Sequence, residues 1–93
     1  MEITFDPVKR DRTFKERGLD FADAASVFAG LTATVEDRRK SYPEPRFITA
    51  GEFDGRVVVM VWTPTTNGRR MISMRYAHVD ESRLWRERMG RSG

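Results

Sequence analysis

The sequence predicts a small α+β domain in which two helices precede an antiparallel sheet and one helix follows it. Residues 46–78 contain three consecutive runs rich in β-branched and aromatic residues, separated by turn residues. Helix start and stop signals occur before these runs and again after them. A chain of 93 residues has room for one hydrophobic core, so residues 1–93 are expected to form a single domain.

Residues 46–78 are expected to form a meander of three antiparallel strands. Asp54-Gly55 suits a type I′ turn between the first two strands, because both turn positions need positive φ. Pro64 and Asn67-Gly68 separate the second strand from the third. The middle strand, residues 57–62, is apolar at every position, which predicts that it is central and covered on both faces.

The third strand, residues 69–78, carries arginines among apolar residues. Arg75 stands between Met74 and Tyr76, which should both face the core. The sheet should therefore have one core face and one arginine-bearing face. Simple alternation divides the strand into Arg69, Met71, Ser73 and Arg75 on one face and Arg70, Ile72, Met74 and Tyr76 on the other.

The start of the chain predicts a strand followed by a helix. Residues 1–5 are a strand candidate, and Asp6-Pro7 then supplies an N-cap acceptor and a first-turn proline. The helix should cover residues 7–17 and end at Gly18. Its exposed surface is strongly basic.

Three further elements complete the predicted order β-α-α-β-β-β-β-α. Asp20 should cap a second helix within residues 21–30, whose apolar residues share one face. Residues 31–35 alternate like a strand, and residues 36–45 are expected to form a loop. Asp80 should cap the last helix, over residues 81–89.

The composition excludes several classes of site. The chain has no cysteine, which excludes disulfides and thiolate metal sites and is compatible with a reducing cytoplasm. His78 is its single histidine and no carboxylate cluster has metal-ligand spacing, so we expect no metal and no cofactor. Neither a signal peptide nor an apolar run of about 20 residues is present, so we expect a cytoplasmic protein without membrane contact.

Arginine and lysine side chains remain as the candidates for function. The formal net charge is +3, which favours an anionic partner. A guanidinium presents a rigid fork of donors that matches phosphate oxygens. The hairpin geometry puts Arg46 near Arg69 and Arg70, and puts Arg75 nearer the opposite end of the sheet. For any single strand arginine, however, a surface ion pair is the commoner role.

Four short motifs occur in order along nearly the whole chain. An aromatic-Asp-Pro-x-Lys opening occupies residues 5–9, and a Gly-x-x-Phe-x-x-Ala-x-x-x-Phe segment occupies residues 18–28. An Arg-led strand covers residues 46–51, and an Ile-Ser-x-Arg strand covers residues 72–75. In this order and spacing the motifs resemble the BrnT family of bacterial type II toxins. Many members of that family carry Lys-His before the helix-ending glycine, where this chain has Glu16-Arg17.

The resemblance implies a compact fold like that of RelE toxins and a ribonuclease activity that inhibits translation. It also implies a BrnA-like antitoxin, which neutralises the toxin and binds operator DNA. RNA cleavage without metal needs an activated 2′-hydroxyl, charge neutralisation on the phosphate and proton delivery to the leaving oxygen. Arg75 and Arg46 are candidates for phosphate stabilisation, and Glu16 and His78 for proton transfer. The candidate RNA-binding residues are Lys9, Arg12, Lys15, Arg17 and Arg69.

Two functions compete at this point. The first is a metal-independent endoribonuclease toxin that an antitoxin neutralises. The alternative is a catalytically inert, basic module of the same fold that binds RNA or protein. Glu16-Arg17 in place of the usual Lys-His favours the alternative. A growth assay on induction, with and without a neighbouring reading frame, would distinguish the two.

Overall fold

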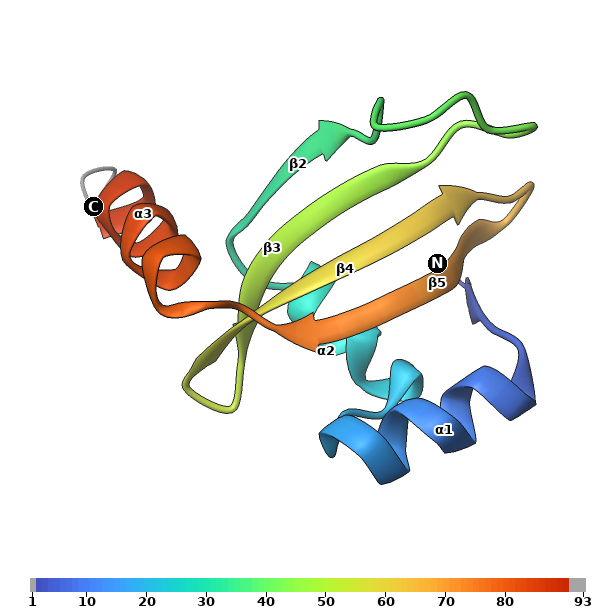
Figure 1. Cartoon of the computed structure of the whole chain (residues 1–93), viewed down its shortest axis with the longest axis horizontal. Helices are drawn as coiled ribbons and strands as arrows, with labels where there is room; N and C mark the ends of the chain where they lie inside the picture. Colours follow the sequence, from blue (N-terminus) through green and yellow to red (C-terminus); the bar gives the residue numbers. More distant parts are fainter. Residues whose placement is uncertain (1, 91–93) are drawn as a thin grey trace.

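The structure, a computed structural model, describes residues 2–90 of the chain. These residues form one five-stranded sheet in the order β1-β5-β4-β3-β2, together with three α-helices (Figure 1). The α+β class is thus confirmed. The strands are β1 (Glu2–Thr4), β2 (Thr32–Glu36), β3 (Phe47–Phe53), β4 (Arg56–Pro64) and β5 (Gly68–Tyr76). The helices are α1 (Pro7–Arg17), α2 (Ala24–Phe28) and α3 (Val79–Gly90).

The sheet is mixed, so the prediction of an antiparallel sheet is wrong at one edge. β3, β4 and β5 form the expected antiparallel meander, and β2 pairs antiparallel with β3. β1 instead pairs parallel with β5, with Glu2 opposite Gly68 and Thr4 opposite Arg70. β1 has only three residues, and so short a strand does not indicate whether it will pair parallel or antiparallel with a strand more than 60 positions away. Met1, which the predicted strand included, lies outside the described residues.

β4 is the centre of the sheet, as its apolar sequence predicted. Val58, Met60 and Trp62 point toward the face that the N-terminal segments cover, and they belong to the main core. Val57, Val59 and Val61 point the other way and are also buried. The core is completed by Leu19, Phe21, Ala24 and Val27, which precede the meander, and by Met71 and Met74 of β5.

β5 contains a bulge that changes the predicted face of its first residues. Ser73 pairs with Val61 and Met71 pairs with Trp62, so Ile72 is the extra residue. Met71 therefore joins Met74 in the core, and it is 1% exposed. The same shift moves Arg69 to the helix-covered face and Arg70 to the face of Arg75. Simple alternation predicted the opposite for both arginines, because it has no place for an extra residue.

The first helix has the predicted bounds but buries none of its residues. The Asp6 carboxylate accepts from the Val8 N–H, and Gly18 ends the helix at φ 71°. The second predicted helix is shorter and divided. A 3₁₀ turn over Phe21–Asp23 precedes α2, because the Asp23 N–H donates to the Asp20 carbonyl three residues before it.

The last helix begins at Val79, two residues before the predicted start. Asp80 therefore lies inside the helix, and His78 occupies the capping position, where its N–H donates to the Glu81 carboxylate at 2.8 Å. Figure 1 shows α3 beyond one end of the sheet, away from α1. The Trp85 indole donates to the Ala50 carbonyl at 3.2 Å and anchors α3 there. Among the helices of residues 2–90, none is long and apolar enough to span a membrane.

Candidate active site

The sheet face opposite α1 and α2 carries the strand arginines that the sequence predicted, except that Arg70 lies there in place of Arg69. Arg75 lies opposite Val59 and Arg70 lies opposite Thr63, so both share this face. The β3 residues that pair with β4 continue the surface toward β2. We call it the arginine face and define it by Ile48, Ala50, Val59, Val61, Thr63, Arg70, Ser73 and Arg75.

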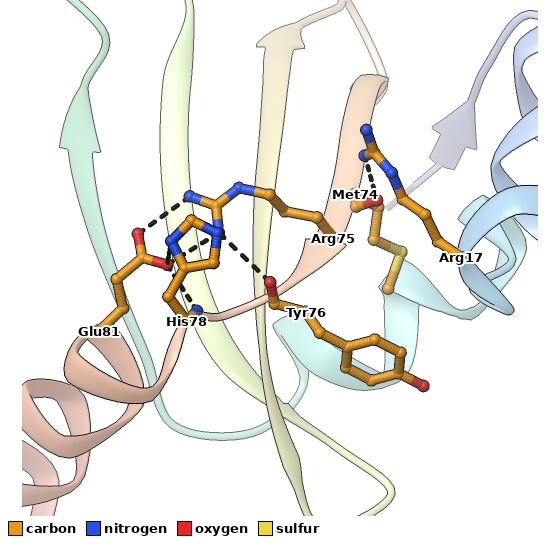
Figure 2. A network of polar contacts seen from close by, with 6 residues as sticks. All are labelled: Arg17, Met74, Arg75, Tyr76, His78 and Glu81. Carbon is orange, nitrogen blue, oxygen red and sulfur yellow. Dashed lines mark hydrogen bonds and ion pairs between the residues drawn. The ribbon is translucent and has the colours of Figure 1, made fainter.

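Arg75 is held by Glu81 from the first turn of α3 (Figure 2). Its Nη1 donates to Glu81 Oε1 at 2.8 Å, and its Nη2 donates to Oε2 at 2.9 Å. Nη1 also reaches the Tyr76 carbonyl at 3.3 Å. The Arg75 side chain remains 35% exposed, so a ligand can reach the guanidinium. The pair is bidentate, which fixes the plane of the guanidinium.

His78 approaches the same carboxylate. Its Nδ1 lies 3.4 Å from Glu81 Oε1, and its side chain is 75% exposed. Figure 2 shows the imidazole, the carboxylate and the guanidinium as one group at the junction of β5 and α3. We call Arg75, His78 and Glu81 the junction cluster. It combines a guanidinium, whose donors match phosphate oxygens, with two groups of the kind that can transfer protons.

The ion pair between Arg75 and Glu81 shifts the pKa values of both groups. The hydrogen bonds from Arg75, followed by the His78 N–H, lower the pKa of Glu81 to about 2. The same ion pair raises the pKa of Arg75. Glu81 is therefore ionised at neutral pH, and its proton affinity depends on whether Arg75 stays with it.

Glu81 was absent from the candidates that the sequence suggested. A usable signal was present, because an acid three residues after a helix-capping position commonly reaches back to the backbone N–H of the cap. The sequence predicted the cap at Asp80, which placed Glu81 at the first helical position instead of three residues after the cap. The error of two residues in the helix start concealed the contact.

A second arginine pair lies in the loop between β2 and β3. Arg39 Nη2 lies 2.7 Å from Asp37 Oδ2, and the Asp37 side chain is fully buried. These hydrogen bonds lower the pKa of Asp37 to about 2. The charge of Arg39 in turn acts on Arg75 and partly opposes the effect of Glu81. The loop thus has an ion pair with a buried carboxylate, which the sequence did not predict.

Arg46 lies at the other end of the arginine face from the junction cluster. Its guanidinium carbon is 4.1 Å from the centre of the Tyr42 ring, and Nη2 is 3.8 Å from Glu44. Phe47 pairs with Trp62 and Arg75 pairs with Val59, so strand geometry separates Arg46 from Arg75 by roughly 15 Å. The structure does not bring these two candidates to one phosphate.

The candidates on α1 are also remote from the junction cluster. Glu16 is exposed, and within residues 2–90 it makes no hydrogen bond or ion pair with Arg75 or His78. Lys15 pairs with Asp11 at 2.9 Å. Arg17 donates to the Met74 carbonyl at 3.0 Å and ties the end of α1 to β5 (Figure 2). Lys9 and Arg12 are exposed.

Arg69 packs on the helix-covered face rather than beside Arg75. Its guanidinium carbon lies 4.0 Å from the centre of the Phe28 ring and 4.6 Å from that of Trp62. Burial lowers the pKa of Arg69. This environment favours a packing role through stacking on the two aromatic rings.

The chain matches a known protein family over most of its length. Residues 5–81 match the family described as the ribonuclease toxin, BrnT, of type II toxin-antitoxin systems. Comparison with curated proteins gave no significant match. The matched region includes the whole junction cluster and ends at Glu81. Because the match covers most of the sequence, the chain belongs to the BrnT family of ribonuclease toxins of type II toxin-antitoxin systems.

Proposed function

We propose that this toxin is a metal-independent endoribonuclease and that the junction cluster is its active site. One observation carries the proposal. The Glu81 carboxylate contacts both the Arg75 guanidinium and the His78 imidazole, at 2.8 and 3.4 Å. RNA cleavage without metal needs a phosphate-binding cation, a base and an acid within reach of one phosphodiester, and these three groups can supply them.

The proposed reaction is an internal transesterification. Arg75 binds the non-bridging oxygens of the scissile phosphate, and Glu81 accepts the proton of the neighbouring 2′-hydroxyl. The 2′-oxygen then forms a bond to phosphorus while the bond from phosphorus to the 5′-oxygen breaks. His78, in its imidazolium form, donates a proton to that leaving oxygen. The products are a 2′,3′-cyclic phosphate and a 5′-hydroxyl.

Substrate binding would also activate the base. In the free protein, the hydrogen bonds from Arg75 lower the pKa of Glu81 to about 2, which makes it a poor proton acceptor. A phosphate that takes over the Arg75 donors weakens this pairing, so the pKa of Glu81 rises toward its ordinary value. The carboxylate would thus gain proton affinity when RNA is bound.

The remaining parts of the proposal concern fold type and partners. A type II toxin has an antitoxin, and we propose that a BrnA-like protein neutralises this one by covering the arginine face. Operator DNA would be bound only through that antitoxin. Inhibition of translation would follow from cleavage of RNA. We also propose a relation to RelE toxins, supported by the family resemblance and by the α+β class.

Product analysis tests the activity. Purified toxin is expected to cut single-stranded RNA into fragments with cyclic phosphate and 5′-hydroxyl ends, with the same rate in EDTA. Glu81→Gln and His78→Ala should each lower the rate about 10²-fold or more. Arg83→Ala, which removes an exposed charge from α3, is the matched control. A correctly folded protein that binds RNA but leaves it intact would support the inert binding module instead. Activity lost in EDTA and restored by added Mg²⁺ would refute metal independence.

A further inference from the structure

A small basic hollow lies at the end of the arginine face remote from the junction cluster. It has a volume of about 100 Å³ and brings together three cations from separate parts of the chain. Lys9 comes from α1, Arg46 immediately precedes β3, and Arg70 belongs to β5. Thr63 lies between the two arginines and donates to the Pro45 carbonyl at 2.6 Å, which holds the Arg46 segment against β4.

The cations of this hollow are weakly compensated within residues 2–90. Lys9 and Arg70 form no ion pair there, and Arg46 has Glu44 only at 3.8 Å. Arg46 Nε is buried and has no hydrogen-bond partner among these residues. This Nε N–H is therefore a donor that no protein group among these residues satisfies.

The acidic side chains of the hollow do not remove this imbalance. Asp6 also lines it, but one carboxylate oxygen accepts from the Val8 N–H at 2.9 Å as the cap of α1. Glu44 is the second acid, and its contact with Arg46 is long for a charge-assisted hydrogen bond. The three cations therefore exceed the two acids.

Two features orient the arginines toward this point. The bulge at Ile72 turns Arg70 onto the arginine face, where regular alternation would have placed it in the core. The Tyr42 ring stacks under the Arg46 guanidinium at 4.1 Å and restricts its position. The Arg46 side chain is thus positioned before any ligand arrives, which lowers the entropic cost of binding.

We propose that Lys9, Arg46 and Arg70 bind a second backbone phosphate of the RNA, roughly 15 Å from Arg75. The inference rests on the proposed ribonuclease function and gives Arg46 a role in substrate binding instead of catalysis. A phosphate group fits better than a carboxylate of a protein partner. The two non-bridging and two ester oxygens of a phosphodiester are arranged tetrahedrally around phosphorus, which suits donors that converge from three directions, whereas both oxygens of a carboxylate lie in one plane.

The test measures binding of a 2′-O-methyl RNA octamer, which cannot be cleaved, over a range of salt concentrations. Each lost phosphate contact should reduce the slope of log K against log salt by about 0.7. Arg70→Ala and Arg46→Ala each remove one of the three cations on this phosphate and should each reduce the slope by up to that amount, and Arg83→Ala should keep the wild-type slope. Arg70 is exposed, so Arg70→Ala should fold normally. It therefore tests the proposal even if Arg46→Ala, which loses the stack on Tyr42, disturbs the loop.

Cleavage kinetics separate this site from the catalytic one. With unmodified RNA, Arg70→Ala should raise KM more than it lowers kcat, whereas Glu81→Gln should act mainly on kcat. The defect of Arg70→Ala should shrink on a dinucleoside monophosphate, which has a single phosphate. If the protein cuts no RNA but the Arg70 and Arg46 variants still change the salt slope, the ribonuclease proposal would be refuted and the phosphate site would be supported. Slopes equal to that of Arg83→Ala, or a loss confined to antitoxin binding, would overturn it.

Discussion

Glu81 contacts three groups through one carboxylate. It accepts two hydrogen bonds from Arg75, accepts one from the His78 N–H, and lies beside the His78 ring. The residue thus connects the start of α3 to the arginine face. A strand arginine such as Arg75 usually forms a surface pair of small energetic value. In the proposed reaction, a bound phosphate would replace Glu81 as the hydrogen-bond acceptor of the Arg75 guanidinium.

Arg75→Ala should abolish cleavage and leave the fold intact. Loss of a donor that stabilises charge in the transition state commonly lowers kcat about 10²- to 10³-fold. The pair is partly exposed, so its contribution to the free energy of unfolding should be about 1 kcal/mol or less. Arg75→Lys keeps the charge but loses the fork, and should recover little activity. Cleavage rates and thermal unfolding curves check both variants, and wild-type cleavage with an unchanged Tm would remove Arg75 from the site.

Stability should fall in acid as Glu81 and Asp37 become protonated. Their folded-state pKa values of about 2 lie below the ordinary values of 4.5 and 3.8. The unfolded chain therefore binds protons first, so this stabilisation is complete above about pH 5 and is lost as pH falls toward 2. Tm measured from pH 7 to pH 2 should decline in that window. The decline should be smaller in a Glu81→Gln, Asp37→Asn double variant, and an equal decline in both proteins would contradict the assignment.

Helix ends and strand edges depend on individual residues at their boundaries. Gly18 can end α1 because it adopts a φ of 71° without strain, and Asp6 starts the helix through its carboxylate. At the parallel edge, Gly68 has a different role. A Cβ at this position would overlap the backbone of Glu2, so β1 can approach β5 only if residue 68 is glycine.

Gly68→Ala should therefore loosen β1. Forcing a methyl group into this contact should cost about 1–3 kcal/mol, the range for overpacked sites. The hydrogen bond from the Glu2 N–H to the Asn67 carbonyl should open, and exchange of the Glu2 amide should accelerate. Gly30→Ala is the matched control, since its Cβ would meet only the Val27 carbonyl, at 3.7 Å. Unchanged unfolding and exchange in Gly68→Ala would contradict the close approach.

Across the whole molecule, the arginine face has basic groups at both ends and apolar strands between them. The junction cluster lies at one end and the Lys9–Arg46–Arg70 hollow at the other. Ile48, Val59 and Val61 lie between these ends on the same face. A partner that binds along this face would meet both basic sites at once, whether it is an RNA strand or an acidic antitoxin segment.

Antitoxin binding should protect the arginine face from hydrogen exchange. Protection is expected over residues 69–75 and the last helix, because an antitoxin that neutralises the toxin through this face must cover Arg75. Exchange measured with and without co-purified antitoxin checks this expectation. Protection confined to residues 7–28 would place the antitoxin on the helices instead and exclude masking of Arg75.

Local chemistry explains which expectations succeeded. The Asp54-Gly55 turn has positive φ at both positions, 51° and 79°, as the dipeptide predicted. The apolar run from Val57 to Trp62 is buried at the centre of the sheet. α1 follows its cap and its terminal glycine. In each case the information lies within a few neighbouring residues, where turn, cap and burial preferences act directly.

The sequence by itself determined the α+β class, the meander, the ends of α1 and the motifs of the family. Only the tertiary structure decided the parallel β1–β5 edge, the bulge at Ile72, the pairing of Arg75 with Glu81 and the convergence of Lys9, Arg46 and Arg70. These features depend on register and on contacts between distant segments. An extra residue in one strand reverses the face of every residue beyond it, and local side-chain periodicity cannot reveal that residue before the strands have paired.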